Sequence, residues 1–321
     1  MKIAIIRLSA LGDIIQATIV LQFIKKHYPD ATIEWICEER FSRVLKNHPL
    51  INETIKLNLK DKNYLKSIKT LLKARKRGYD LAIDLQGLIK SALVARIVCK
   101  NVVGFDKFSS REGLSSLFYS KKFMIDYNEN IIIRNLFLVA FALDFKVDKD
   151  EILNKAQCFS TKEKIVKNRV LIAPFASEAS KIYTKFNLVI DEIDTDEIYI
   201  CYGNDDEKQR ALAITKTTKA KLLEKMSLDG LVEFVSSCAL TIGNDSAITH
   251  LAWAQNRASI TLFGNRPSKR NSFLTPFNLT IDTGKKIDAF KIDKSDFCIN
   301  EIDPNLVAKM ANELLRKIDE K

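Results

Sequence analysis

The chain alternates short apolar segments with longer amphipathic ones, and this alternation restricts its fold more than any other feature. Residues 3–6 form an apolar run, a polar turn follows at residues 9–13, and an amphipathic pattern continues to about residue 27. Strand, turn and helix in this order are typical of the start of an α/β unit. We expect further strands at Thr32–Ile36, Leu81–Asp84 and Val102–Gly104, and further helices at Glu39–Lys46, Tyr64–Arg77, Ile89–Cys99 and Asn130–Phe145.

Residues 146–168 interrupt the alternation, because they are rich in Lys, Asp and Glu and have little apolar periodicity. This break predicts two domains, 1–155 and 156–321. Two successive runs of alternating segments predict two doubly wound parallel sheets, an α/β fold whose domains bind ligands beyond the carboxyl ends of the strands, in a cleft between them. In the second run we expect strands at Val170–Ala173, Ile198–Tyr202, Leu240–Ile242 and Ser259–Phe263, and helices at Glu207–Ala213, Leu228–Ser236, Ile248–Ala254 and Pro304–Ile318.

Composition excludes several classes of protein. The 321 residues are 46% hydrophobic and 28% charged, which is typical of a globular chain rather than a disordered one. No run of about twenty apolar residues is present, so no membrane-spanning helix is expected. A secretory signal is not expected either, since only Ile3–Ile6 separate Lys2 from Arg7. The six cysteines lie far apart without a C-x-x-C pair, which favours reduced core thiols in a cytosolic protein.

Positive charge is concentrated in the first half of the chain. Residues 1–160 contain 27 Lys and Arg against 17 Asp and Glu, a net charge of +10, whereas residues 161–321 contain 24 against 23, a net charge of +1. This asymmetry suggests an anionic partner for the first half, such as nucleic acid, acidic lipid or a polyanionic substrate. A surface that only keeps the protein soluble is the alternative.

Several common cofactor and catalytic motifs are missing. No two of the ten glycines are two residues apart, so the chain has neither a G-x-G-x-x-G nor a Walker A loop, and it has no G-x-S-x-G elbow. The three histidines are too few and too scattered for a histidine-based metal centre. A D-x-D motif at Asp194–Asp196 precedes its strand instead of following it, so a solvated loop is favoured over a metal site.

Polar segments follow the expected strands in both domains. Asp13 stands at the carboxyl edge of the first strand, where it is either a general base or a cap of the next helix. Gly12 before it allows a tight turn. Asp245 and Ser246 begin a helix whose free N–H groups favour phosphate, and His250 lies one turn further along. Weaker signals of the same kind are Gln86–Ser91, Lys181 and Gly203–Glu207.

Six segments together resemble the ADP-heptose:lipopolysaccharide heptosyltransferases of glycosyltransferase family 9, which are inverting enzymes with the two-Rossmann-domain GT-B fold. The resemblance runs through nearly the whole chain. Two of the segments, WICEERF and REGLSSLFYS, look like heptosyltransferase I, which adds the first heptose to a Kdo sugar of the lipid A inner core. The other four are RLSALGDIIQA, DLQGLIKSA, KMSLDGL and GNDSAITHLA.

The resemblance implies an acceptor-binding N-terminal domain and a C-terminal domain that binds ADP-heptose. Asp13 matches the family's catalytic base, and Lys181 matches a lysine that contacts the donor phosphate. The chain departs from the family at Ala247, which replaces a glycine, and at Gly264–Arg266, which replaces G-P-T. The implied donor-binding residues are Ser177, Lys181, Glu207 (ribose), Met226 (adenine), Asp245, Ser246, Ala247 and His250, and the implied acceptor-binding residues are Ser9, Gln86 and Arg111.

The implied reaction needs no metal and no other cofactor. The implied partners are ADP-heptose, the Kdo-lipid A acceptor and the acidic cytoplasmic face of the inner membrane of a Gram-negative bacterium, and we expect a monomer that binds no nucleic acid. The basic stretch Lys56–Arg77 matches the acceptor loop only in composition. The alternatives are heptosyltransferase II, another GT-B enzyme with a different acceptor, or a basic nucleic-acid-binding protein, although no nucleic-acid motif is present.

Overall fold

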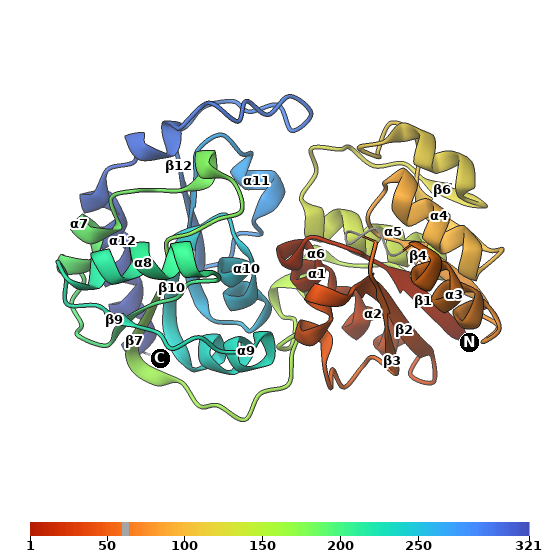
Figure 1. Cartoon of the computed structure of the whole chain (residues 1–321), viewed down its shortest axis with the longest axis horizontal. Helices are drawn as coiled ribbons and strands as arrows, with labels where there is room; N and C mark the ends of the chain where they lie inside the picture. The colour runs from red at the N-terminus through yellow and green to blue at the C-terminus, as the bar shows by residue number, and fades with distance from the viewer. Residues whose placement is uncertain (60–63, 321) are drawn as a thin grey trace. The chain divides into compact units, whose positions relative to one another are not determined.

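The computed structural model describes residues 1–59 and 64–320 and contains two compact units, Met1–Ser160 and Thr161–Lys321 (Figure 1). The division lies inside the charged stretch 146–168, a few residues after position 155. This stretch also contains a short helix, α6 (Lys149–Leu153). Within the described ranges, no helix has the length and the apolar character needed to cross a membrane.

The N-terminal unit is built on one parallel sheet of six strands, in the order β3-β2-β1-β4-β5-β6. Strands that are buried on both faces read as continuous apolar runs, which explains why β1 and β4 are evident in the sequence. The edge strands β3 and β6 carry lysines and were not predicted. The strands are β1 (Lys2–Ile6), β2 (Thr32–Glu38), β3 (Glu53–Leu57), β4 (Leu81–Asp84), β5 (Val102–Phe105) and β6 (Lys121–Phe123).

Helices cover both faces of this sheet. On one face lie α1 (Leu11–Ala17), α2 (Ile19–His27) and α5 (Ile131–Leu143), which pack on one another. On the other face lie α3 (Tyr64–Arg75), α4 (Ile89–Val98) and the 3-10 helix η2 (Gly113–Phe118), with α4 between its two neighbours. Leu71 of α3 and Ala95 of α4 enter the core that this second layer forms with Ile6.

The C-terminal unit repeats the same topology, with the strand order β12-β11-β10-β7-β8-β9. Its strands are β7 (Val166–Ala173), β8 (Ile198–Ile200), β9 (Lys221–Leu222), β10 (Cys238–Asn244), β11 (Ala258–Phe263) and β12 (Asn278–Asp282). Its helices are η3 (Ala179–Lys181), α7 (Phe186–Asp191), α8 (Asp205–Thr215), α9 (Leu228–Ser237), α10 (Ala247–Ala254), α11 (Ser268–Asn271), η4 (Cys298–Glu301) and α12 (Pro304–Asp319).

Both sheets reverse their strand order at the first strand of the unit. β1 lies between β2 and β4, and β7 lies between β8 and β10. The chain therefore leaves the neighbouring strands β1 and β4, or β7 and β10, toward opposite sides of the sheet. In open α/β sheets such a reversal opens a crevice at the carboxyl ends of the strands, where ligands bind.

Four local predictions were wrong in detail. The first long helix is two helices separated at Thr18, and the predicted helix at Glu39–Lys46 is the 3-10 helix η1 (Glu39–Leu45). Gly12 lies inside the first turn of α1 and has no positive φ. The basic helix α3 ends at Arg75, so Arg77 is outside it.

Arg77 is bound by two carboxylates and is not one of the free surface cations. Its guanidinium pairs with Glu53 through both terminal nitrogens and with Glu34 at 2.8 Å, which ties the chain after α3 to β2 and β3. The pairing with Glu53 raises the pKa of Arg77 further above its usual value. Of the basic stretch Lys56–Arg77, residues 60–63 lie outside the described residues.

Candidate active site

In the N-terminal unit, Arg7 holds Asp13 at the carboxyl edge of β1. Nη2 of Arg7 lies 2.9 Å from Oδ1 of Asp13, and Nη1 donates a hydrogen bond to the carbonyl of Leu85, directly after β4. The Arg7 side chain is 7% exposed, whereas that of Asp13 is 40% exposed. A single guanidinium therefore connects the two strands at the strand-order reversal and orients a carboxylate that solvent can still reach.

Asp13 also contributes to the start of α1. Its Oδ2 accepts a hydrogen bond from the backbone N–H of Ala10 at 3.0 Å, a contact that satisfies one donor at a helix N-terminus. The capping interpretation of Asp13 is thus part of the observed geometry. The capping contact uses only one oxygen of the carboxylate, because the other, Oδ1, points to Arg7.

Gln86 fastens the loop after β1 to the loop after β4. Its Oε1 accepts from the backbone N–H of Leu8 at 2.8 Å, and its Nε2 donates to Oγ of Ser9 at 3.4 Å. Ser9 and Gln86, both predicted on the acceptor side, are therefore neighbours and lie on the same edge as Asp13.

A buried carboxylate that the sequence analysis did not identify, that of Asp84, holds the turn that carries Gln86. Asp84 accepts hydrogen bonds from the backbone N–H of Gln86 at 2.9 Å and from the hydroxyls of Ser91 and Tyr119 at 2.7 Å each. Burial raises the pKa of Asp84, and these hydrogen bonds oppose that effect. The next residue, Gly87, has a φ of +69° that favours glycine.

Arg111, the third predicted acceptor residue, is exposed on the loop that follows β5. Its two neighbours anchor this loop beside the Gln86 turn. A Cβ on Gly87 would lie 3.3 Å from Oγ of Ser110, and a carboxylate oxygen of Glu112 accepts from the backbone N–H of Ile89 at 2.8 Å. The backbone on both sides of Arg111 is therefore anchored beside the Gln86 turn.

In the C-terminal unit, Asp245 is buried between two basic side chains. Its Oδ2 lies 2.8 Å from Nζ of Lys181, and its Oδ1 lies 3.2 Å from Nε2 of His250. Burial alone would raise the pKa of Asp245, but the Lys181 ammonium and the His250 imidazole outweigh it and hold that pKa well below its usual range. The aspartate after β10 thus fixes the lysine that follows β7.

Two buried hydroxyls, on the residues directly before Lys181 and directly after Asp245, have no partner among the described residues. They are Oγ of Ser180 in η3 and Oγ of Ser246, the residue that precedes α10. A buried hydroxyl without a partner is costly unless a ligand uses it. Together with the N-terminus of α10, where Ala247 takes the first helical position, they suit an anionic oxygen such as that of a phosphate.

Asn244, another residue that gave no separate signal, fixes the segment that carries Ser177 and Lys181. Its Nδ2 donates to the carbonyl of Pro174 at 2.8 Å, and its Oδ1 accepts from the backbone N–H of Tyr183 at 3.1 Å. These two contacts lie on either side of the segment, so the loop after β7 is tied to the end of β10. Ser177 itself is exposed.

Glu207 and Met226 lie beyond the carboxyl ends of β8 and β9. Oε2 of Glu207 accepts from the backbone N–H of Gly203 at 2.6 Å, and its own N–H donates to Oδ1 of Asn204 at 2.9 Å, which fixes the start of α8. Met226 precedes α9 and is 36% exposed. An accessible carboxylate and a thioether on this edge suit hydroxyl groups and a flat apolar ring, respectively.

Arg266, where the chain departs from the family pattern, also lies at this edge. Its Nη2 binds Oε2 of Glu178 at 3.0 Å, and Nζ of Lys294 binds the same oxygen at 3.0 Å. These contacts hold the pKa of Glu178 below its usual value, although burial opposes them. Glu178 directly follows Ser177, so two further cations border the predicted phosphate-binding segment.

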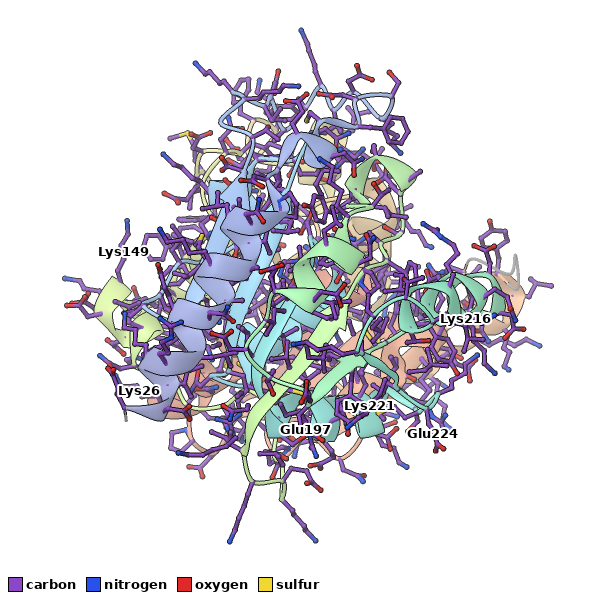
Figure 2. All side chains as sticks on the ribbon, turned by 90° about the vertical axis from the view of Figure 1, so that its left-hand side faces the viewer. Lys26, Lys149, Glu197, Lys216, Lys221 and Glu224 are labelled. Atoms are coloured by element: carbon purple, nitrogen blue, oxygen red, sulfur yellow. The ribbon has the colours of Figure 1, made fainter. Side chains whose placement is uncertain are left out.

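The D-x-D motif lies at the opposite edge of the C-terminal sheet. Asp194 and Asp196 precede β8, and Asp194 pairs with Arg316 at 3.3 Å. Glu197 and Lys221, both labelled in Figure 2, form an ion pair of 3.0 Å at this same amino edge. In the described residues, no three His, Cys, Asp or Glu side chains gather in a way that would hold a metal ion.

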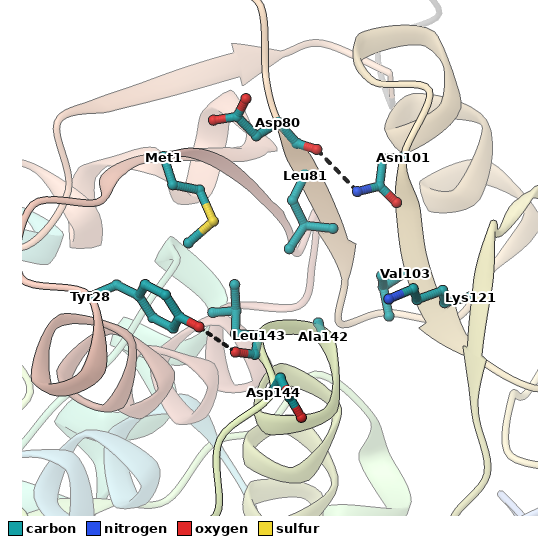
Figure 3. A pocket seen from close by; sticks show the side chains of 10 residues that line it. All are labelled: Met1, Tyr28, Asp80, Leu81, Asn101, Val103, Lys121, Ala142, Leu143 and Asp144. Carbon is teal, nitrogen blue, oxygen red and sulfur yellow. Dashed lines mark hydrogen bonds between the residues drawn. The ribbon is translucent and has the colours of Figure 1, made fainter.

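The N-terminal unit has a pocket of about 310 Å³, but it lies at the amino edge of its sheet (Figure 3). Met1, Leu81 and Val103, near the starts of β1, β4 and β5, line it together with Tyr28. The Tyr28 hydroxyl donates to the carbonyl of Leu143 at 2.6 Å. None of the predicted site residues lines this pocket, so it is separate from the candidate site.

Sequence comparison identifies the family. A profile of glycosyltransferase family 9 (heptosyltransferase) matches residues 67–281. The chain is also 45% identical to lipopolysaccharide heptosyltransferase 1 of Campylobacter coli, over 98% of this chain and 99% of that protein. The chain belongs to glycosyltransferase family 9. The predicted family membership is therefore confirmed, and this family 9 protein is a glycosyltransferase.

Other family 9 proteins agree in sequence or fold. Lipopolysaccharide heptosyltransferase 1 of Escherichia coli strain K12 is 25% identical over 82% of this chain and 88% of its own. Among solved structures, E. coli heptosyltransferase WaaC with ADP has a TM-score of 0.77 at 20% identity, with both chains covered completely. E. coli ADP-heptose lps heptosyltransferase II has a TM-score of 0.71 at 21% identity, again with complete coverage. These likenesses confirm the predicted fold class.

Proposed function

We propose that this family 9 protein is a heptosyltransferase I, which moves L-glycero-D-manno-heptose from ADP-heptose to a Kdo sugar of the lipid A inner core. The observation that carries the proposal is the 45% identity to the C. coli lipopolysaccharide heptosyltransferase 1 over nearly the full length of both chains. The two anchored polar clusters, one at each strand-order reversal, support it.

In the proposed reaction Asp13 is the general base. An acceptor hydroxyl is a poor nucleophile, so Asp13 accepts its proton while the oxygen attacks the anomeric carbon. The bond between that carbon and the β-phosphate oxygen breaks, and ADP leaves with the bonding electrons. One displacement of this kind inverts the anomeric centre. The orientation of Asp13 by Arg7, together with its exposure, supports this role.

Lys181 and the N-terminus of α10 stabilise the charge that grows on the leaving β-phosphate. An ammonium has three N–H donors, and Asp245 takes one of them, so Lys181 keeps donors for phosphate oxygens. His250, Ser246 and the backbone at Ala247 complete this phosphate site. Because fixed cations and a helix N-terminus supply the positive charge, we propose that the reaction needs no metal ion.

The remaining predicted residues bind the two substrates. Glu207 accepts hydrogen bonds from the ribose hydroxyls, Met226 packs on the adenine, and Ser177 donates to a phosphate oxygen. Arg111 pairs with a Kdo carboxylate or a lipid A phosphate, with Ser9 and Gln86 beside it. We place the enzyme, as a monomer, at the cytoplasmic face of the inner membrane of a Gram-negative bacterium, a location that the +10 charge of residues 1–160 supports.

The test is transfer of heptose from ADP-heptose to Kdo-lipid A, followed by determination of the anomeric configuration of the product. UDP-sugars in place of ADP-heptose test the donor, and an acceptor that already carries one heptose tests the position. Transfer to Kdo with inversion supports the proposal. Transfer only to the pre-heptosylated acceptor indicates heptosyltransferase II, and retention of configuration contradicts the single displacement.

A further inference from the structure

Helix α3 exposes a stripe of large apolar side chains in addition to the face that it buries. Leu65, Ile68 and Leu72 are 77%, 44% and 48% exposed. Their spacing of three and four residues places them along one side of the helix. The other side packs into the core of the N-terminal unit through Leu71 and Ala74. Among the described residues of this unit, the fold therefore leaves the exposed stripe largely uncovered.

The neighbours of α3 extend this stripe. On α4, Leu93 is 43% exposed, although Ala92 and Val94 on either side are buried. On η2, Leu114 and Leu117 are 65% and 72% exposed, and residues three apart in a 3-10 helix share one side. Since α4 packs against both α3 and η2, these side chains belong to one layer. We call the six the apolar outer face: Leu65, Ile68, Leu72, Leu93, Leu114 and Leu117.

Cations accompany the apolar outer face. Helix α3 has exposed lysines at positions 66, 69, 73 and 76, just beside the stripe or directly after the helix, and α3, α4 and η2 contain no Asp or Glu. Residues 64–123 include 13 Lys and Arg against four Asp and Glu. Of those four acids, Asp84 is buried and Asp80 lies at the amino edge of the sheet. The outer surface of this layer therefore combines aliphatic side chains with an excess of positive charge.

We propose that the apolar outer face inserts into an anionic lipid bilayer, with its aliphatic side chains among the acyl chains and the lysines of α3 at the lipid phosphates. A helix that presents aliphatic residues beside lysines is typical of elements that lie in a membrane interface. This inference rests on the proposed function, because a lipid-anchored acceptor gives the insertion its purpose. It goes further by assigning the surface and by requiring insertion as well as attraction of charges.

Position in the fold agrees with this assignment. Helix α4 begins directly after the Gln86 turn, and η2 begins two residues after Arg111, so both start at the edge that carries the predicted acceptor residues. The face therefore adjoins that edge. A sugar chain anchored in the bilayer reaches Ser9 and Gln86 from the same surface on which the protein rests.

Two other occupants match only half of this surface. A second copy of the chain would cover the aliphatic side chains but would bring one set of lysines against the other. A nucleic acid would pair with the lysines but would leave six aliphatic side chains without a partner, since bases stack on aromatic rings. An anionic bilayer satisfies both the charge and the apolar surface.

The first experiment measures flotation of the full chain with vesicles of phosphatidylcholine alone or mixed with phosphatidylglycerol. The variant Leu65→Ser, Ile68→Ser, Leu72→Ser should bind the mixed vesicles at least about tenfold more weakly, because burial of each aliphatic side chain is lost. The matched control is Leu188→Ser, Leu274→Ser, Leu306→Ser, which removes three exposed leucines of the C-terminal unit and should bind like wild type. Unchanged Tm values verify that both variants fold.

The second experiment separates insertion from attraction. An Ile68→Trp variant places an indole on the stripe. Both native tryptophans, Trp35 and Trp253, are buried, so their emission should not change. A blue shift of the tryptophan emission on mixed vesicles therefore reports insertion of the new side chain. Replacing Lys66, Lys69, Lys73 and Lys76 by Gln should weaken binding at low salt by about fivefold per lysine. The charge-matched control carries Gln at Lys164, Lys216, Lys225 and Lys309.

The vesicles contain no lipid A, so their binding does not depend on the proposed reaction, which a short soluble acceptor tests separately. Wild-type binding by the serine variant, or loss in the lysine variant alone without a blue shift, would overturn insertion. A dimer in solution that the serine variant abolishes would assign the face to a second copy. Equal competition by a random duplex would assign it to nucleic acid.

Discussion

Arg7 and Asp13 form an ion pair of 2.9 Å in which the arginine is buried and the aspartate is accessible. The same guanidinium donates to the carbonyl of Leu85, so it fixes the position of Asp13, after β1, relative to the end of β4. A base must be oriented toward the proton that it takes and must remain open to the substrate. The pair meets both requirements with one fixed cation.

Asp13→Asn should lower kcat by at least about 10²-fold at temperatures where the variant is still folded. The amide has nearly the same size, but it cannot take the proton. It also leaves Arg7, whose side chain is 7% exposed, without its counter-charge, so Tm should fall as well. Steady-state kinetics with ADP-heptose and thermal unfolding measure the two effects separately.

The control for this change is Asp303→Asn. Asp303 caps α12 by accepting from the backbone N–H of Asn305 at 3.0 Å, and Asn is an equally good cap. Asp303→Asn should therefore keep the Tm and the turnover of wild type, so that a loss of turnover is specific to Asp13→Asn. Near-normal turnover of Asp13→Asn would leave the residue as a helix cap alone.

Tyr119→Phe should raise KM for the acceptor without changing KM for ADP-heptose. The change removes the hydroxyl that donates to buried Asp84, and Asp84 in turn holds the Gln86 turn. Loss of one hydrogen bond to a buried group costs about 1–3 kcal/mol, which urea unfolding measures. The loss also raises the pKa of Asp84 further, since burial already raises it.

Tyr28→Phe is the matched control, because the Tyr28 hydroxyl also makes one hydrogen bond in the N-terminal unit, to the carbonyl of Leu143 at 2.6 Å. That bond lies at the amino edge of the sheet, beside the pocket in Figure 3. Tyr28→Phe should lose stability with no change in KM for the acceptor. Equal kinetic effects in both variants would reduce Asp84 to a purely structural role.

Chelation by EDTA should leave transfer of heptose unchanged. Lys181 and the N-terminus of α10 supply positive charge where the leaving phosphate forms, so the proposed mechanism gives a divalent cation no task. Activity assays before and after chelation measure this. Loss of activity with recovery on addition of magnesium or manganese would contradict the mechanism and would direct attention to Asp194 and Asp196.

The sequence predicted the buried strands well and the edge strands poorly, for a physical reason. β1, β4 and β10 are covered on both faces, so their residues form apolar runs that stand out from their surroundings. The three-residue strand β6 has two lysines, because one of its sides faces solvent. Such a short polar segment has the sequence pattern of a loop. Only its pairing with β5 in the folded structure makes it a strand.

The candidate site shows the same limit. Motifs after strands located Asp13, Asp245 and His250, since parallel strands bring their carboxyl ends to one edge. Which side chains contact one another was beyond prediction, because that depends on tertiary contacts. Asn244, for example, binds Tyr183 across 61 residues of sequence, and no local pattern marks such a pair.

Asp245→Asn should destabilise the protein at pH 7 by about 3–5 kcal/mol, because it leaves the nearly buried Lys181 without its counter-charge. The Lys181 side chain is 15% exposed and lies 2.8 Å from Asp245. Urea unfolding of both proteins measures the difference in the free energy of unfolding. The control is Asp196→Asn, since Asp196 is 93% exposed and should change that free energy by no more than about 0.5 kcal/mol.

The destabilisation by Asp245→Asn should also depend on pH in a defined direction. Burial raises the pKa of Asp245, but Lys181 and His250 lower it further, so the folded value lies below the ordinary carboxyl value of about 3.9. Such a group stabilises the fold at pH values above its unfolded pKa and loses that contribution as the pH falls through its folded pKa. The gap between wild type and variant should therefore be full at pH 7 and should narrow below about pH 4. A gap that stays constant from pH 7 to about pH 3 would show that the ionised carboxylate does not stabilise the fold by pairing with Lys181.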